Sequence, residues 1–326
     1  MKKTKSNKNQ TLKTILIAAA AFVLAFFIGM EYGASHSDRT DINCTSAPSE
    51  TSASPFDGTF SPDKEDDAVL SVYAIDVGQG DAFLLVSPNG KTMLIDAGEA
   101  KTQKKVQAFL ESKNISSLDI AVATHPHSDH IGAFPWLFDR FDVGKLLMPD
   151  VESSSGTYKN FMQSVKAHDI DYYAVWCGDT VEWDKDCTVT ILGPVEGIEY
   201  SADDMNEWSI MMRVEYKGTS MIFTGDAEAH SEQAALLFND KELFDADVLK
   251  VGHHGSAYSS TQGFLDAVSP EYAVISAGKD NKFGHPHAET LLKFEMMDTA
   301  VYRTDINGNI TIILDGENVR IITEKD

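Results

Sequence analysis

The sequence predicts a layered α/β domain over residues 67–326, and three observations support that fold class. Short strand-like apolar runs alternate with helical runs through the whole segment, which is typical of helices packed on sheets. Hydrophobic residues make up 43% of the 326 residues, enough for a sizeable core, so wholesale disorder is excluded. No internal repeat recurs, which argues against a solenoid or a propeller. No stretch of linker composition divides the segment, so we expect one domain.

The expected strands are short, apolar and bounded by turn residues. In chain order they cover residues 69–75, 82–87, 92–97, 118–124, 145–149, 172–176, 188–192, 210–216, 220–225, 246–252, 272–278, 309–315 and 318–324. The turn Pro88-Asn89-Gly90 predicts a hairpin between the second strand and the third. Helical spacing marks residues 101–113, 157–169 and 227–237.

Ahead of this domain, residues 14–32 predict one N-terminal hydrophobic helix. Thr14 to Met30 form 17 residues without a charge, so a helix here could just cross a bilayer. Five lysines make residues 1–13 a basic cytoplasmic tail, and the positive-inside rule then places the rest of the chain outside the cell. The alternative is a cleaved signal peptide, which would release the domain, but the length favours an uncleaved anchor. Both interpretations export the domain.

Between this segment and the domain, residues 33–66 are rich in Ser, Thr, Asp and Pro and predict a disordered tether. Of the three cysteines, Cys44 falls in the tether, whereas Cys177 and Cys187 end two neighbouring strand candidates. A disulfide across that hairpin and two separate buried thiols are equally compatible with the spacing.

The charge balance limits the partners. The chain has 27 Lys and Arg against 50 Asp and Glu, and five of the lysines precede residue 14. The remainder therefore carries 22 basic and 50 acidic groups, a net of −28. Such a surface repels polyanions at long range, so tight non-specific DNA binding is not expected. Any nucleic-acid chemistry would depend on a local site.

The densest polar cluster directly follows the strand expected at 118–124 and reads His125-x-His127-x-Asp129-His130. Three imidazoles and a carboxylate so close together cannot all be core residues, because their polar groups would compete for burial. The loop can direct His125 and His127 at one cation and Asp129 and His130 at a second. Imidazole and carboxylate together suit zinc and similar ions. A solvated histidine-rich turn is the alternative.

Three further loops begin at expected strand ends. They carry Asp226, the pair His253 and His254, and the pair His285 and His287. One such residue alone is more often a turn or surface residue, but binding sites in α/β folds gather at strand ends. We therefore expect these loops to converge on one site.

Together these motifs resemble the metallo-β-lactamase-fold hydrolases over about residues 67–325. The H-x-H-x-D-H loop is the hallmark of that family, and Asp96 matches its structural aspartate. The resemblance implies an αββα four-layer sandwich of two similar halves, preceded here by the hydrophobic helix. It also implies that Asp226 bridges two metals and that His254 is the last metal-binding histidine.

Other motifs are similar to the C-terminal domain of ComEC-type DNA-uptake proteins and to choline-phosphate esterases of the cell wall. They are Asp76-Val77-Gly78-Gln79-Gly80-Asp81, Asn206-Glu207-Trp208-Ser209, the segment 250–256 and His285-Pro286. Here Asp76 and Asp81, like Asp96, are expected to give structural support. ComEC proteins carry this domain on a many-helix channel, so DNA transport by this chain is unsupported.

The resemblance implies two divalent metal ions, with Zn²⁺ the expected identity and Mn²⁺ the alternative. The first would be held by His125, His127 and Asp226, and the second by Asp129, His130, Asp226 and His254. The first set lacks a histidine that many members supply. Asn206 stands in that region instead, and His168 is expected on the surface of the helix at 157–169.

The resemblance thus implies an exported, membrane-tethered phosphodiesterase that uses a metal-bridged hydroxide. The expected catalytic residues are Asp129, His253 and His285, and the expected substrate-binding residues are Ser256, His287 and Asn206. Loop structure is the alternative role for Ser256 and His285. By resemblance the substrate is a phosphodiester polymer, with nucleic acid ahead of a wall polymer.

Three other functions stay open. They are a wall phosphoesterase of the choline-phosphate type, a lactonase or β-lactamase, and a non-catalytic metal-binding module.

Overall fold

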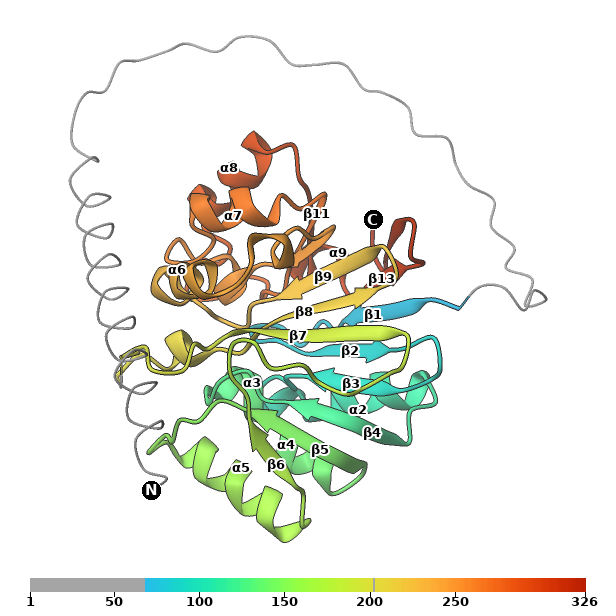
Figure 1. Ribbon diagram of the computed structural model, residues 1–326. Helices are drawn as coiled ribbons and strands as arrows, with labels where there is room; N and C mark the ends of the chain where they lie inside the picture. The colour runs from blue at the N-terminus through green and yellow to red at the C-terminus, as the bar shows by residue number, and fades with distance from the viewer. Residues whose placement is uncertain (1–67, 202) are drawn as a thin grey trace, which may run out of the picture. The chain divides into compact units, whose positions relative to one another are not determined.

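Two β-sheets pack face to face in the computed structural model, which describes residues 68–201 and 203–326 (Figure 1). In the first sheet the strand order is β14 (Val319–Thr323), β13 (Ile310–Leu314), β1 (Leu70–Ala74), β2 (Phe83–Val86), β3 (Thr92–Ile95), β4 (Ser117–Val122), β5 (Asp142–Met148) and β6 (Tyr172–Ala174). In the second sheet it is β12 (Ala300–Arg303), β11 (Tyr272–Ile275), β10 (Val248–Lys250), β9 (Thr219–Phe223), β8 (Met211–Tyr216) and β7 (Cys187–Gly193).

Helices cover the outer face of each sheet. The first sheet carries α2 (Gln103–Ser112), α3 (Ser128–Ile131), α4 (Phe134–Phe138) and α5 (Gly156–Ala167). The second carries α6 (Ala229–Phe238), α7 (Gln262–Val268) and α8 (Ala288–Met296), and α9 (Thr304–Asn307) follows β12. Figure 1 shows α4 and α5 in green on one side of the paired sheets and α6 to α8 in orange on the other.

Three separate apolar clusters hold these four layers together. Phe83 of β2 and Phe223 of β9 meet edge to face at 5.6 Å in the cluster between the sheets. A second cluster joins the first sheet to α2, α4 and α5, and a third joins the second sheet to α6, α7 and α8. Strand residues alternate between the inner and outer clusters because successive side chains point to opposite faces of a sheet. The αββα sandwich expected from the sequence is confirmed.

The parallel strands of both sheets end toward the same edge of the sandwich. β3, β4 and β5 run parallel in the first sheet, as do β9, β10 and β11 in the second. The loops that leave the carboxyl ends of β3, β4, β9, β10 and β11 therefore meet at one edge, as binding loops do in α/β folds. All of the polar motifs found in the sequence lie in or next to these loops.

The strand predictions agree with the structure except at one place. β12 was missed because its four residues are half-buried or exposed and do not stand out as an apolar run. The hairpin turn at 88–90 joins β2 to β3, and the helical run at 157–169 is α5. Cys177 and Cys187 are free thiols, so of the two alternatives the structure contains the separate cysteines.

The predicted tail 1–13, hydrophobic helix 14–32 and tether 33–66 lie outside the described residues. Among the residues that are described, no helix has both the length and the apolar character that a bilayer span requires.

Candidate metal centre

Asp96, at the end of β3, organises the first loop of the site. Its Oδ1 accepts a hydrogen bond from the Thr124 amide at 2.8 Å, and its Oδ2 accepts one from the Thr124 hydroxyl at 2.7 Å. The same Oδ2 lies 2.7 Å from Nδ1 of His130. Asp96 is fully buried and has a left-handed backbone (φ 57°), a conformation that persists only where its surroundings impose it. This carboxylate fixes the His130 ring so that Nε2 is the nitrogen left for a ligand role.

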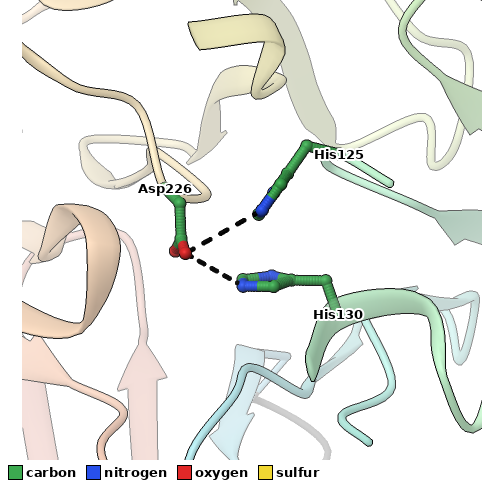
Figure 2. A group of neighbouring side chains, drawn as sticks. All are labelled: His125, His130 and Asp226. Atoms are coloured by element: carbon green, nitrogen blue, oxygen red, sulfur yellow. Dashed lines mark hydrogen bonds and ion pairs between the residues drawn. The ribbon is translucent and has the colours of Figure 1, made fainter. Parts of the chain in front are cut away.

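Asp226, in the loop after β9, faces His125 and His130 of the loop after β4. Its Oδ2 lies 3.1 Å from Nε2 of His130 and 3.9 Å from Nε2 of His125, and Figure 2 shows both rings directed at it. These three side chains are buried and bring their ligand atoms close enough to hold one ion. His127 lies beside this group: its Nδ1 is 3.0 Å from Nε2 of His125, a separation that suits two imidazole nitrogens on one ion, so its ligand role stays a prediction.

A second group forms where the loop after β10 meets the H-x-H-x-D-H loop. Nε2 of His254 lies 3.5 Å from Oδ2 of Asp129 and 3.3 Å from Oδ2 of Asp226. Nδ1 of His254 lies 2.9 Å from the Ser276 carbonyl oxygen, which fixes the ring. Asp129, His130 and His254 can together hold an ion. Because Nε2 of His130 can bind one ion only, this histidine serves one group or the other.

The residues present fit divalent metal ions. Oδ1 of Asp226 and Nε2 of His254 are buried and have no hydrogen-bond partner among the described residues. Buried polar atoms are normally paired, so two orphaned atoms at one spot indicate a missing partner. Imidazole nitrogens and carboxylate oxygens are the donor set of zinc and related ions. These residues could hold the ions, and their fixed second nitrogens are typical of metal-binding histidines.

The electrostatics of the cluster point to the same conclusion. Burial alone would lower the pKa of His130, but Asp226 and Asp96 outweigh it and raise that pKa well above its usual range. Burial would also lower the pKa of His254, but Asp226 and Asp81 outweigh burial and raise that pKa well above its usual range. Both rings therefore hold protons at the positions where a metal would bind. Metal binding would displace those protons, because imidazole ligates in its neutral form.

His253, predicted as a catalytic residue, also faces Asp226. Its Nε2 lies 3.8 Å from Oδ2 of Asp226, and its Nδ1 lies 2.9 Å from Oε1 of Glu228. Asn206 donates from Nδ2 to the same Glu228 oxygen at 3.2 Å, and its Oδ1 is buried without a partner. A histidine held through one nitrogen by a carboxylate is arranged like a metal ligand. His253 thus faces the same Asp226 oxygen as His125, His130 and His254.

The remaining loop histidines, His285 and His287, differ in how many of their ring nitrogens already have hydrogen-bond partners. His285 is 9% exposed, its Nδ1 has no partner among the described residues, and its ring stands 5.1 Å from that of His253. Burial, together with His253 and His254, lowers the pKa of His285 to about 4. His287 has both ring nitrogens occupied, since Nδ1 accepts from the Ala257 amide and Nε2 faces the Phe283 carbonyl oxygen. His287 thus fastens two loops, and substrate contact is not its evident role.

Ser256, predicted to contact substrate, is 1% exposed, and its hydroxyl accepts a hydrogen bond from the Tyr258 amide at 3.3 Å. Its carbonyl oxygen accepts from the Thr290 hydroxyl. These contacts show a buried, locally bonded serine that shapes its loop, and substrate contact by Ser256 stays a prediction. Loop structure, the alternative role that we considered for Ser256, fits these contacts.

Lys250 is the residue that sequence reasoning overlooked. It is 1% exposed, and its ammonium group pairs with Oδ2 of Asp81, donates to the Gly225 carbonyl oxygen at 2.5 Å and lies 3.7 Å from Oδ1 of Asp226. Burial opposes its charge, but Asp81 and Asp226 outweigh burial and raise its pKa, so Lys250 stays protonated. A single lysine within the apolar run at 246–252 was the available signal, because lysine is almost never buried unless paired.

The turn at 76–81 delivers Asp81 to this lysine. At Gly80 a Cβ atom would lie 2.3 Å from the Asp129 carbonyl oxygen, so only glycine allows the turn to approach the H-x-H-x-D-H loop so closely. Asp81 is 1% exposed, and its Oδ1 lies 3.4 Å from Nδ1 of His254. Asp76 is further out and accepts from the Gly78 amide within its own turn. These positions agree with the supporting roles expected for both aspartates.

His168 lies apart from the site at the C-terminal end of α5. Its Nε2 pairs with Oδ1 of Asp139 at 3.1 Å, and its Nδ1 lies 2.9 Å from the Ser164 carbonyl oxygen. As expected for a surface helix residue, it contacts none of the predicted ligands.

Comparison with known proteins agrees with this geometry. A model of the Metallo-beta-lactamase superfamily matches residues 75–279, which include every predicted ligand. The chain belongs to that superfamily. Membership supports a metal-dependent hydrolase, and the site described above is the place where metallo-β-lactamase-fold chemistry would occur.

Several curated relatives of the chain carry names that refer to competence or recombination. The chain is 33% identical over 256 residues to ComE operon protein 3 of Bacillus subtilis, covering 73% of this chain and 32% of that protein. It is 29% identical over 247 residues to Recombination protein 2 of Haemophilus influenzae, covering 74% and 28%. It is 31% identical over 245 residues to competence protein ComA of Neisseria gonorrhoeae, covering 75% and 32%. The chain thus spans about a third of the length of these relatives.

Solved structures of the metallo-β-lactamase fold are more distant. CmlA, a diiron beta-hydroxylase from Streptomyces venezuelae, is 13% identical with a TM-score of 0.48, covering 79% of this chain and 54% of CmlA. A diphosphatase of the PhnP family is 13% identical with a TM-score of 0.44, covering 76% and 99%.

The first prediction concerns the metal ligands. Asp226→Asn should lower the content of both metals, because Oδ2 of Asp226 faces ligand nitrogens of both groups. Asp129→Asn should remove second-site metal while some first-site metal survives. Metal stoichiometry by inductively coupled plasma mass spectrometry on the full chain measures both effects. The control is His168→Ala, which should leave metal content unchanged. If His168→Ala strips metal as thoroughly as Asp226→Asn, the ligand assignment is wrong.

The second prediction concerns the buried lysine. Lys250→Met should lower the free energy of unfolding by about 3–5 kcal/mol, because it leaves the Asp81 carboxylate buried without its partner. The double change Lys250→Met with Asp81→Asn should cost less than the sum of the two single changes, since the uncompensated charge is gone. Urea unfolding of the metal-free chain measures these differences. Strictly additive losses would show that the two groups are not coupled.

Proposed function

We propose that this chain is an exported, membrane-tethered, metal-dependent phosphodiesterase. The observation that carries the proposal is the convergence on Asp226 of three histidines, His125, His130 and His254, with Asp129 beside them and orphaned buried atoms between them. Phosphodiester chemistry needs neutralisation of negative charge and an activated water, and this donor set is suited to bind the ions that supply both. The similarity to competence proteins favours nucleic acid as the substrate.

Divalent ions bound here would acidify water and neutralise charge on a phosphoryl oxygen. Around these ions, different residues of the chain would orient the ligands and accept a proton. Asp96 and the Ser276 carbonyl oxygen hold His130 and His254 in fixed orientations, so no reorganisation is needed when substrate arrives. Asp129 has a 23% exposed side chain, so this carboxylate can meet an incoming water and accept its proton.

The leaving alkoxide needs a proton, and His253 is the side chain placed to give one. His285 is neutral near pH 7, because its pKa is lowered to about 4, so it could only relay a proton that it has received. His285 has an unpartnered Nδ1, and its ring borders that of His253. Glu228 fixes the His253 ring, which fits either proton relay or metal ligation. Loss of His253 separates its two roles, because metal content falls only if His253 is a ligand, whereas loss of His285 should leave metal content unchanged.

The third prediction tests the reaction class. The metal-loaded full chain should hydrolyse bis-p-nitrophenyl phosphate, and chelation should abolish the release of p-nitrophenolate, which absorbance at 405 nm records. Asp129→Asn should slow the reaction by about a hundredfold or more, because it removes both a second-site ligand and the expected general base. A chain that binds metal but leaves this diester and a nucleic-acid strand intact would favour the non-catalytic module. Turnover of a choline-phosphate ester in preference to the diester would favour the wall phosphoesterase.

The fourth prediction tests export, which rests on the sequence of residues 1–32 alone. The lysine-rich tail precedes the apolar run, so protease added to intact cells should digest the C-terminal domain. Immunoblotting against the C-terminus follows the digestion, and an endogenous cytoplasmic protein serves as the control for cell integrity. Protection of the domain until the cells are lysed would contradict an outward orientation.

A further inference from the structure

A hollow of about 830 Å³ opens beside Asp129, outside the ring of ligand side chains. Four segments line it: the turn at 76–79, the stretch 99–105 at the start of α2, Ser128 and Asp129 of the H-x-H-x-D-H loop, and the loop 278–283 after β11. Asp129 belongs both to this hollow and to the second ligand group, so whatever lies in the hollow reaches the metal centre directly. The hollow is large enough for several nucleotide-sized groups and has an open side toward solvent.

The hollow is locally basic in an acidic protein. Its lining contains four lysines, Lys101, Lys105, Lys279 and Lys282, whereas the chain as a whole has a net charge of −23. The lining carboxylates number three, and Asp129 among them is assigned to metal. Cations gathered in a concave site raise the local concentration of an anionic ligand.

Two of the four lysines are free to bind a ligand. Lys101 pairs with Glu99, and Lys105 donates to the Asp76 carbonyl oxygen at 3.3 Å. Lys279 and Lys282 are exposed, and no ion pair joins either of them to a carboxylate in the part of the chain that the structure describes. Lysines without partners can exchange their counterions for the phosphates of a polyanion.

An aromatic ring stands at the rim of the same hollow. Phe283 is 51% exposed, and its inner face stacks on His285 with ring centroids 5.7 Å apart and planes inclined by 23°. The Lys282 ammonium group lies over the Phe283 ring, 4.9 Å from its centre, so a base that stacks there takes its place while the ammonium moves to a phosphate. An exposed ring beside lysines is the combination that holds single-stranded nucleic acid, because an unpaired base stacks on the ring while the lysines bind phosphates. A polyol-phosphate wall polymer has no flat ring to place there.

The loop that carries these groups is held in place. Oδ1 of Asn281 accepts from the amides of Phe283 and His285 at 3.1 and 3.0 Å, and Nδ2 of Asn281 donates to the Gly278 carbonyl oxygen. A Cβ atom on Gly278 would lie 2.7 Å from the Gln79 amide nitrogen, so this loop packs directly on the turn at 76–79. A ligand would therefore meet preformed walls, which lowers the entropic cost of binding.

We propose that this lysine groove, defined by Lys101, Lys105, Lys279, Lys282 and Phe283, binds a single strand of nucleic acid and leads one phosphodiester to Asp129. The proposal rests on the proposed function for its chemistry, but binding can be measured without hydrolysis. Lys279 and Lys282 hold backbone phosphates, and Phe283 stacks on one base. The acidic remainder of the surface confines binding to the groove.

Fluorescence anisotropy tests the proposal with the metal-loaded full chain and a fluorescein-labelled oligothymidine of twelve nucleotides, whose phosphorothioate linkages slow hydrolysis. Lys279→Gln with Lys282→Gln should weaken binding about tenfold at low salt. It should also reduce the slope of log K against log salt by about 1.4, which is two phosphate contacts to a single strand. Phe283→Ala should weaken binding about tenfold with the salt slope unchanged. A duplex of the same length should bind more weakly than the single strand.

Matched controls lie on the far helix and the edge strand. Lys159→Gln with Lys166→Gln removes the same charge from exposed positions of α5, and Tyr173→Ala removes a 52% exposed ring from β6. Both should leave the affinity and the salt slope unchanged. Equal effects of the groove and control variants would overturn the proposal, whether or not the chain hydrolyses diesters. An effect of the lysines without any effect of Phe283 would overturn the assignment to nucleic acid and indicate a polyanion that lacks bases.

Discussion

The charge balance at the junction of the two sheets is the constraint on which the rest of the site depends. Four carboxylates, those of Asp81, Asp96, Asp129 and Asp226, lie within one small region, and three of them are almost completely buried. Buried carboxylates are tolerated only where hydrogen bonds and cations offset the loss of hydration. The chain supplies one permanent cation, Lys250, and two imidazoles that hold protons. Divalent metal ions bound here would take the place of those imidazole protons, which accounts for the buried atoms that have no partner among the described residues.

The sandwich makes this concentration of charge possible. Three apolar clusters stabilise the four layers, so the loops at the carboxyl ends of the strands need not contribute to the core. Those loops can then adopt costly conformations. His253 and His254 both have left-handed backbones, with φ of 45° and 55°, and Asp96 is similar. Each is unfavourable by about 1–3 kcal/mol, and each belongs to the ligand cluster or fixes one of its members.

Much of this arrangement could be predicted from the sequence, and the exceptions have physical reasons. Apolar periodicity located every strand except β12, because its run of four residues is too short and too polar to stand out. The loop motifs placed His125, His130, Asp226 and His254 together because strand ends share an edge. Spacing could not show that His127 faces His125, that Ser256 is buried, or that Glu228 fixes His253. Those contacts depend on side-chain directions that only the packed structure sets. Lys250 interrupts an apolar run, which signals burial, but the sequence could not show which carboxylates pair with it.

The buried Lys250 ammonium group has a consequence for the order in which the protein folds and binds metal. Small zinc domains are unfolded without their metal, because the ion itself supplies most of the folding energy. Here a lysine already compensates two aspartates, and the apolar layers are independent of the ligands, so we expect the chain to reach its folded shape before any ion arrives. Folding and metal acquisition then become separate events in time. The ion that occupies the site then depends on which metals are available to the folded protein.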